Sequence, residues 1–301
     1  MTPVVDRAAA IRQGRRLRRL QMLHFRLRSL SRLFRKGPAR EVHIETSAGR
    51  VRTLWYGFDN PSVAPLFIDL HGGGFILGNP EMDEAINLQF CQQVGCKVIS
   101  IDYAKAPEHP FPAAVDQVYA VAQHLVAHAA EYGIDAARIG IGGHSAGANL
   151  ATVACLKAAR EGDFQFVCQL LDYPPLDLGT SPFAKPNPQG GIPPKVAQMF
   201  DSCYVDPAEA RHPYVSPVYA DPADLAQLPP ALLIVAGHDS LHDEGVRYAE
   251  MLRAAGVPAT CHDYPNAAHG FTLKPSADTT DALAKMVAFL REHLADVRHR
   301  Q

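Results

Sequence analysis

The sequence predicts an α/β fold, in which a mostly parallel sheet is covered on both faces by helices. Short apolar runs alternate with stretches of helical periodicity through most of the 301 residues. Such alternation is typical of parallel strands joined by crossover helices. A strand–turn–helix pattern over residues 138–154 also places a serine at a sharp turn between two buried elements. The length suits one large α/β domain with ample residues for a core.

We expect eight strands and six long helices, besides the helix that follows the serine. The expected strands are residues 41–49, 50–57, 65–70, 97–102, 136–142, 164–171, 231–236 and 259–264. The expected helices are residues 8–36, 81–93, 112–132, 195–204, 243–255 and 277–295. The first two strands alternate apolar and polar residues and are expected to pair near Ala48-Gly49.

The first helix is basic and amphipathic. Its apolar residues Leu20, Leu23, Leu27, Leu30 and Phe34 recur at three- and four-residue steps, with arginines between them. One interpretation is a cap helix that lays this stripe on the body of the protein. The other is binding at an anionic membrane surface. We favour the cap, because a large body is available for packing, and we treat residues 1–40 and 41–301 as separate regions.

One section interrupts the alternation of strands and helices. Residues 174–230 hold 13 of the 24 prolines and only one plausible helix. A long proline-rich excursion inside an α/β domain is more often a functional loop or lid than a linker.

Charge is distributed unevenly along the chain. Residues 1–40 contain 12 of the 29 basic residues and one of the 31 acidic residues, which leaves 17 basic and 30 acidic residues in the remainder. An acidic body is a poor surface for nucleic acid, so a nucleic-acid partner is not expected.

The cysteine pattern indicates a reducing compartment. Six cysteines are present and none forms a C-x-x-C pair, so we expect free thiols in a cytoplasmic protein. No apolar stretch reaches the length of a membrane span, and the basic N-terminal segment lacks the apolar region of a signal peptide.

Ser145 is the candidate nucleophile. It stands in Gly143-His144-Ser145-Ala146-Gly147, between an apolar strand run and a helix. Glycines on both sides remove side chains that would clash where the strained backbone folds close to itself. The helix that starts at Ala146 points its N–H groups and positive dipole end at the serine.

A serine nucleophile needs a base, and the base needs an orienting carboxylate. In a parallel sheet, reacting groups lie beyond the carboxyl ends of the strands. Asp239 follows the strand 231–236, and His269 follows the strand 259–264. Asp243 is the second choice for the acid. The expected chemistry is acyl transfer, with His269 as base and Asp239 as its orienter.

The run His71-Gly72-Gly73-Gly74 directly follows the strand 65–70. Three glycines allow bare backbone N–H groups to approach an oxyanion. The expected oxyanion donors are Gly73, Gly74 and Ala146, while Gly72 supports the loop and His71 holds it by hydrogen bonds.

Together these motifs resemble the hormone-sensitive-lipase-like branch of the α/β-hydrolase fold, which includes bacterial carboxylesterases and acetyl esterases. The resemblance rests on the motifs His71–Phe75, Asp102-Tyr103, Ala106–Ala114, Gly143–Gly147, Asp239–Gly245 and His269–Phe271, in family order within residues 64–295. It implies the triad Ser145, Asp239 and His269. It also implies oxyanion donors at Gly73, Gly74 and Ala146, and a cap built from the N-terminal helices and an excursion at about 174–215.

The chain departs from the family pattern at three places. His144 replaces the usual acid before the nucleophile, Ala148 replaces a glycine, and Ala104-Lys105 replaces Arg-Leu. None of these changes touches the triad, but His144 alters the local charge and bears on the pH optimum.

Several other residues have more ordinary interpretations. His238 and His242 are spaced like zinc ligands, but they lie at a strand end, so no metal and no cofactor are expected. Tyr103 and Glu108 are expected to organise the loop beneath the site. Apolar residues that could line an acyl pocket are Phe75, Ile76, Leu77 and Phe200.

The sequence therefore predicts a serine carboxylesterase for small, short-acyl esters, whose partner is the ester and which could form a homo-oligomer. The alternatives are a membrane-surface lipase, a non-catalytic small-molecule receptor on the same scaffold, and an amidase or lactonase with the same triad.

Overall fold

The computed structural model describes residues 6–32 and 37–295, without the side chains of residues 24–32. It contains an eight-stranded sheet with the order β1-β2-β4-β3-β5-β6-β7-β8. The strands are β1 (Arg40–Thr46), β2 (Gly49–Tyr56), β3 (Ala64–Leu70), β4 (Lys97–Ile101), β5 (Ile134–His144), β6 (Gln169–Asp172), β7 (Ala231–His238) and β8 (Ala259–Ala268). Pairing is antiparallel from β1 to β2 and from β2 to β4, and parallel elsewhere. The prediction of a mostly parallel eight-stranded sheet is confirmed.

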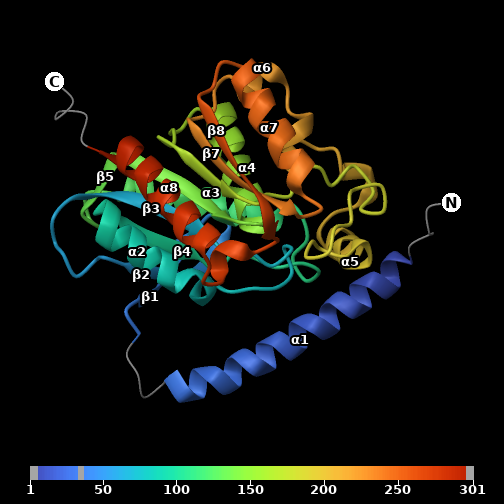
Figure 1. Cartoon of the computed structure of the whole chain (residues 1–301). Helices are drawn as coiled ribbons and strands as arrows, with labels where there is room; N and C mark the ends of the chain where they lie inside the picture. The colour runs from blue at the N-terminus through green and yellow to red at the C-terminus, as the bar shows by residue number, and fades with distance from the viewer. Residues whose placement is uncertain (1–5, 33–36, 296–301) are drawn as a thin grey trace.

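Helices cover both faces of the sheet (Figure 1). The α-helices are α1 (Arg7–Arg32), α2 (Glu84–Val94), α3 (Ala113–Ala127), α4 (Ala146–Glu161), α5 (Pro194–Tyr204), α6 (Pro222–Leu225), α7 (His242–Ala254) and α8 (Ala277–Leu294). Short 3₁₀ helices are η1 (Pro80–Asp83), η2 (Pro207–Glu209), η3 (Pro217–Tyr219) and η4 (Phe271–Leu273). Helices α2 and α8 share one core with the sheet, and α3, α4 and α7 share the other.

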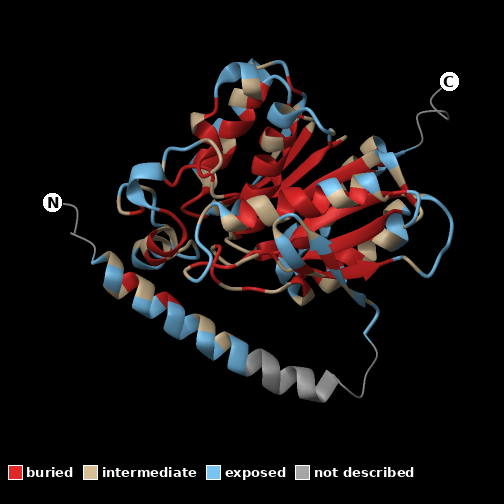
Figure 2. Ribbon diagram, turned by 180° about the vertical axis from the view of Figure 1, so that it is seen from behind, coloured by how far each residue is buried: buried red, intermediate tan, exposed pale blue. Residues whose placement is uncertain are grey.

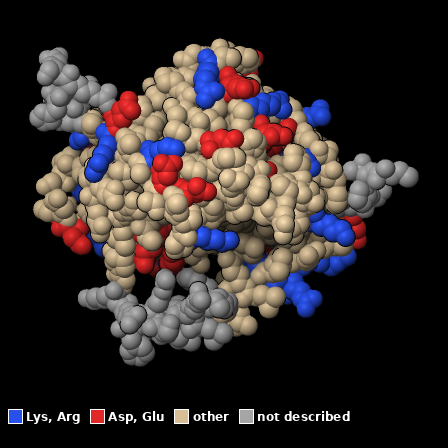
Figure 3. Space-filling model, viewed as in Figure 1, with Lys and Arg blue, Asp and Glu red and all other residues tan. Residues whose placement is uncertain are grey.

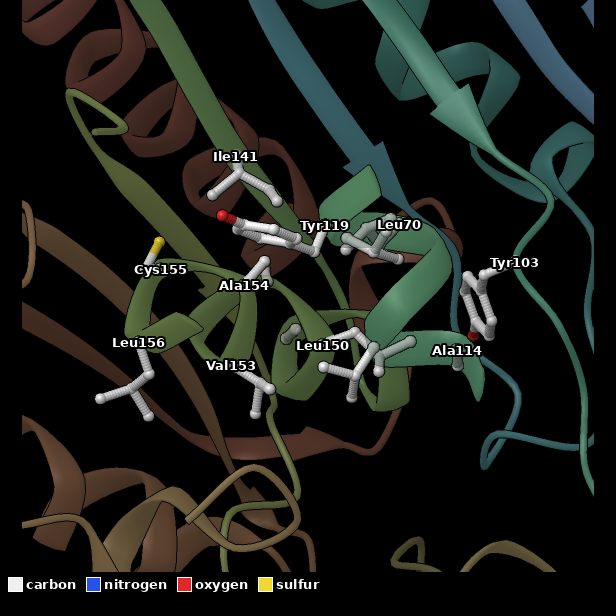
Figure 4. Packing of buried hydrophobic residues seen from close by; sticks show 14 of the residues in the cluster. Leu70, Tyr103, Ala114, Tyr119, Ile141, Leu150, Val153, Ala154, Cys155 and Leu156 are labelled. Carbon is white, nitrogen blue, oxygen red and sulfur yellow. The ribbon is translucent and has the colours of Figure 1, made fainter. Parts of the chain in front are cut away.

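The alternation of side chains along β3 explains why both cores are needed. Leu66, Ile68 and Leu70 belong to one core, whereas Phe67 belongs to the other, because successive strand residues point to opposite faces. The strands of the sheet interior are accordingly buried between helices whose outer faces are exposed (Figure 2). Figure 4 shows Leu150 and Ala154 of α4 in the same cluster as Leu70 of β3 and Ile141 of β5, so the helix that follows the serine packs on the sheet.

Strand β6 is shorter than the predicted strand 164–171. It begins at Gln169, although Phe164 and Phe166 are apolar. Those two rings pack on each other at 5.2 Å between centroids, and Phe164 also stacks on Tyr119 of α3. Their apolar character therefore reflects packing between helix and loop, which the sequence pattern cannot distinguish from a strand.

Helix α1 lies against α5 with a face other than the predicted leucine stripe. Leu20 and Leu23 are 56% and 57% exposed, so the expectation that these residues pack on the body is wrong. The contact is made around Gly14, where an added Cβ would lie 2.5 Å from Cys203 Sγ of α5. A helix approaches most closely where it lacks side chains, which favours this small-residue face. Leu27, Leu30 and Phe34 lie outside the described side chains.

Ion pairs hold the two ends of this contact. Arg7 binds Asp206 at 2.6 Å, just beyond α5, and Arg18 lies 3.3 Å from Glu108. In Figure 3, basic side chains gather along the described part of α1, whereas both signs mix over the body. None of the helices within residues 6–32 and 37–295 is long and apolar enough to cross a bilayer.

Candidate active site

Ser145 occupies a sharp turn between β5 and α4. Its backbone has φ +52° and ψ −119°, a conformation that non-glycine residues rarely adopt. The close approach depends on Gly143 and Gly147, because an added Cβ would lie 2.2 Å and 1.9 Å, respectively, from the carbonyl oxygen of Leu70. The Ser145 N–H donates to the carbonyl of Asp172 at 2.8 Å, which ties the turn to β6.

The structure brings the three predicted triad residues together. His269 Nε2 lies 3.1 Å from Ser145 Oγ, and His269 Nδ1 lies 2.6 Å from Asp239 Oδ2. Asp239 is 1% exposed and also accepts a hydrogen bond from the Leu241 N–H. With the proton on Nδ1 donated to Asp239, Nε2 is free to accept the proton of the serine hydroxyl.

The second choice for the acid lies elsewhere. Asp243 has a largely exposed side chain and binds His242 Nδ1 at 2.9 Å, on the first turn of α7. His242 also lies 3.2 Å from Asp263, whereas His238 ends β7. The two histidines thus do not share one helix face, which is what a zinc helix requires.

The glycine loop after β3 lies beside the serine. Gly73 and Gly74 have φ +132° and +58°, and an added Cβ at Gly72 would lie 3.6 Å from Ser145 Cβ. Within residues 6–32 and 37–295, no acceptor binds the N–H groups of Gly73, Gly74 and Ala146. Three donors are therefore available next to the serine hydroxyl.

His71 supports this loop as predicted from the sequence. Its Nδ1 is 2.7 Å from the carbonyl oxygen of Gly72, and its ring stacks on Tyr103 at 4.3 Å. The Tyr103 hydroxyl donates to the His71 carbonyl at 2.7 Å. Burial, together with the charge of Lys105, lowers the pKa of His71 to about 3, so the ring is a neutral hydrogen-bond donor.

His144 lies in a buried polar cluster beneath the serine. Its Nδ1 is 2.7 Å from Asp172 Oδ2, which also accepts a hydrogen bond from Thr272. Ligand atoms of His144, Asp69 and Asp83 lie within 4.8 Å of one another. Burial alone would lower the pKa of His144, but Asp83, Asp172 and Asp69 raise it to about 10. The imidazolium is thus itself the cation that these carboxyl groups surround.

The cluster reaches His269 through an aromatic ring. Because the Thr272 hydroxyl donates to Asp172, the Tyr173 hydroxyl donates to Thr272 Oγ1 at 3.0 Å, and the Tyr173 ring meets that of His269 edge-on at 4.8 Å. Sequence reasoning missed the roles of Asp172 and Tyr173 here. Asp69 did offer a signal, since it is the one charged residue in an otherwise apolar strand run.

Two pockets meet at Ser145, and both are also lined by Gly74, Ile192 and Phe200. The outer pocket is the more open and contains His269. The inner pocket is more enclosed, and His269 does not line it. Its remaining lining residues are Phe75, Pro175, Leu178, Pro182, Lys185, Ala197, Asp201, Ser240 and Leu241.

The expected acyl-pocket residues are divided between pocket and core. Phe75 and Phe200 line the inner pocket. Ile76 is fully buried in the core, and Leu77 packs against the same core. Gly190 of the excursion accepts a hydrogen bond from the His269 N–H at 3.2 Å, so the proline-rich section forms part of the site.

Comparisons with known proteins find similar chains over most of this sequence. The sequence model of a family described as alpha/beta hydrolase fold matches residues 67–273. The carboxylic ester hydrolase LipN of Mycobacterium tuberculosis is 34% identical over 281 residues, covering 86% of this chain and 73% of the relative. The esterase LipI of the same organism is 33% identical over 236 residues, covering 77% and 74%.

Solved esterase structures are similar over most of the chain. A thermostable esterase from Pseudomonas putida superposes with a TM-score of 0.79 at 29% identity, covering 86% of this chain and 83% of that one. An esterase from the archaeon Pyrobaculum calidifontis superposes with a TM-score of 0.79 at 29% identity, covering 97% and 93%.

Proposed function

Since the chain belongs to the α/β-hydrolase family, in its hormone-sensitive-lipase-like branch, we propose that this carboxylic ester hydrolase is a serine esterase for small, short-acyl esters. The observation that carries the proposal is the hydrogen-bonded chain from Ser145 through His269 to Asp239. The glycine-loop N–H groups beside the serine support it.

In the acylation half of the reaction, His269 Nε2 removes the Ser145 proton while Oγ attacks the ester carbonyl carbon. The carbonyl oxygen becomes an oxyanion and accepts hydrogen bonds from the N–H groups of Gly73, Gly74 and Ala146. Asp239 stabilises the imidazolium that forms. His269 then protonates the leaving alkoxide, which departs as the alcohol and leaves an acyl-enzyme.

In the deacylation half, water replaces the alcohol beside His269. The histidine removes a proton from this water, and the resulting hydroxide adds to the acyl carbon. Collapse of the second oxyanion breaks the bond to Ser145 Oγ, which recovers its proton from His269. The products are the carboxylic acid and the free enzyme, and no cofactor enters the balance.

The test is hydrolysis of nitrophenyl esters from acetate to laurate by the native protein and by Ser145→Ala. We expect rates to be greatest for short acyl chains. We also expect Ser145→Ala to lower kcat by about a millionfold, because the nucleophile is lost. Ser62→Ala, at an exposed serine, is the matched control and should keep the native rate. Retention of most activity by Ser145→Ala would overturn the mechanism.

A second candidate is a lipase that acts at a membrane surface. The observation in its favour is the exposure of Leu20, Met22 and Leu23 on a helix rich in arginine. Apolar side chains beside cations suit an anionic bilayer surface. This function would require a maximum at long acyl chains in the series above, together with sedimentation on vesicles containing anionic phospholipid. Complete inactivity would instead favour an amide or lactone substrate, or a receptor role.

We further propose a cytoplasmic location. All six cysteines are free thiols, which supports a reducing compartment. The proposed partner is the ester substrate, and association of the chain into a homo-oligomer belongs to the proposal.

A further inference from the structure

The position of His269 gives each of the two pockets a role in ester cleavage, if the proposed function holds. His269 must protonate the leaving alcohol, so the alcohol lies on its side of Ser145, in the outer pocket. The acyl group is attached to the same carbonyl carbon on the opposite side. It therefore enters the inner pocket, which is lined by Ser145 but not by His269.

The inner pocket is apolar except for a small polar group of side chains. Lys185 and Asp201 are the two charged residues in its described lining. An alkyl chain that filled this pocket would remove water from both. Burial of an ionic group without hydrogen-bond partners is costly, so these residues oppose a long alkyl acyl chain.

Lys185 is held firmly in the pocket wall. Its Nζ donates to Glu244 Oε2 at 2.6 Å, and the side chains are 12% and 7% exposed. Glu244 is fixed in turn by the Leu176 N–H, which donates to Oε1 at 3.0 Å. Glu244 balances the charge of Lys185, so the pocket does not call for an anionic ligand. The ammonium has three N–H donors, and Glu244 is its one hydrogen-bond acceptor among the described residues.

The carboxyl group of Asp201 has acceptor oxygens that are available to a ligand in the pocket. Its carboxyl group accepts no hydrogen bond from any residue within 6–32 and 37–295, although it is partly exposed to the pocket. Burial raises the pKa of this carboxyl group to about 7, against the opposing effect of Lys185. Both protonation states are therefore populated near neutral pH, and a ligand must accommodate either.

We propose that the inner pocket selects acyl groups that carry a hydroxyl group. A hydroxyl oxygen accepts from Lys185 and its O–H donates to Asp201, whose carbonyl oxygen still accepts when the carboxyl group is protonated. An ammonium or a carboxylate satisfies only one of the two residues. The substrate class is thus esters of short hydroxy acids, and plain short acyl groups are accepted because they leave room for water beside Lys185 and Asp201.

The test compares ethyl esters of straight-chain acids with ω-hydroxy counterparts in which the hydroxyl replaces the terminal methyl group. Pairs from butanoate with 3-hydroxypropanoate to heptanoate with 6-hydroxyhexanoate scan the depth of the pocket. Acid release is measured by titration, with Ser145→Ala as the blank. We expect at least one hydroxylated ester to exceed its alkyl counterpart about tenfold in kcat/KM, because unpaired polar groups penalise the alkyl chain.

Variants at Asp201 connect this preference to the pocket. Asp201→Leu is expected to abolish or reverse the kcat/KM ratio of the pair. Asp201→Asn, which keeps a donor and an acceptor in nearly the same shape, should retain part of it. Asp59→Leu, at an exposed aspartate, is the control for the same chemical change. Lys185 is unsuitable for substitution because Glu244 would be left buried and unpaired.

The outcomes separate this inference from the proposed function. Hydrolysis of the alkyl esters without a hydroxyl preference at any length overturns the inference alone. An equal preference in Asp201→Leu also overturns it, since the selection would then lie elsewhere. Failure of the native protein to hydrolyse any ester overturns the serine-esterase function and this inference with it.

Discussion

At the scale of single residues, the glycine loop offers a test of oxyanion stabilisation. An added Cβ at Gly73 would lie 2.2 Å from the Leu77 carbonyl oxygen, so Gly73→Ala must displace the loop N–H groups. We expect kcat to fall by about a hundred- to a thousandfold, the usual effect of losing such a donor. Gly95 also has a positive φ (+77°, against +132° at Gly73), but nothing lies within 4 Å of the Cβ that Gly95→Ala would add. This control should keep native kcat, and equal losses in both variants would refute the oxyanion role.

The buried imidazole of His144 predicts a pH dependence of stability. Its pKa is raised from 6.5 to about 10, so the folded state holds the proton more tightly than the unfolded state. The stabilisation is complete below pH 6.5 and is lost as the pH rises through about 10. His144→Gln should therefore cost about 3–5 kcal/mol at pH 6, as expected for breaking a buried ion pair, and much less at pH 10.

Urea unfolding of the native protein and His144→Gln at both pH values measures this difference. His109→Gln, at an exposed histidine, is the control and should leave the midpoint unchanged. A destabilisation by His144→Gln that is the same at pH 6 and pH 10 would show that the imidazole is neutral in the folded protein.

The residues of the candidate triad were predictable because their structural surroundings constrain the neighbouring sequence. A turn as tight as that at Ser145 demands glycine on both sides, and Asp239 and His269 must follow strands. The partners of His144 could hardly be recognised from the sequence. Asp172 ends a four-residue strand, and only the register of β6 beside β5 shows that it faces the imidazole.

At the scale of elements, helix α1 is connected to the pocket through α5, which it contacts. Helix α5 carries Phe200 and Asp201, which line the inner pocket, and α1 supports its opposite side near Cys203. Figure 1 shows the N-terminal end of α1 beside α5. Displacement of α1 should therefore loosen the pocket wall without touching the hydrogen bonds among Ser145, His269 and Asp239.

Gly14→Leu tests this coupling, because its side chain would collide with Cys203 and Ile76. We expect a lower Tm and a KM for short esters raised several-fold, with a smaller change in kcat. Gln13→Leu adds the same side chain on the exposed face of α1 and should alter neither quantity. An unchanged Tm in Gly14→Leu would mean that α1 is not a working part of the cap.

The contact face of α1 was not predictable from hydrophobic periodicity. The pattern favoured Leu20 and Leu23, whereas contact is made where Gly14 permits the closest approach and where arginines find acidic partners. Periodicity measures which residues avoid water, not which face another element can approach. The arrangement of the sheet was easier to predict, because buried parallel strands are continuously apolar.

At the scale of the whole molecule, the site joins elements that are distant in the chain. Ser145 and His269 are separated by 124 positions, and Asp239 and His269 by 30. Ser145 follows an interior strand, β5, whereas His269 follows β8, which is the last strand at one edge of the sheet and pairs with β7 alone.

This placement sets the order in which heat should affect the protein. Edge elements open locally at a lower free-energy cost than the interior of a sheet. Fraying of β8 would carry the imidazole away from a serine whose own strand is still intact. Activity assayed at rising temperature should therefore disappear before the far-ultraviolet circular dichroism does, and coincident curves would contradict this. The enzyme would then lose its activity before its secondary structure, and its thermal limit would be set by the strand at one edge of the sheet.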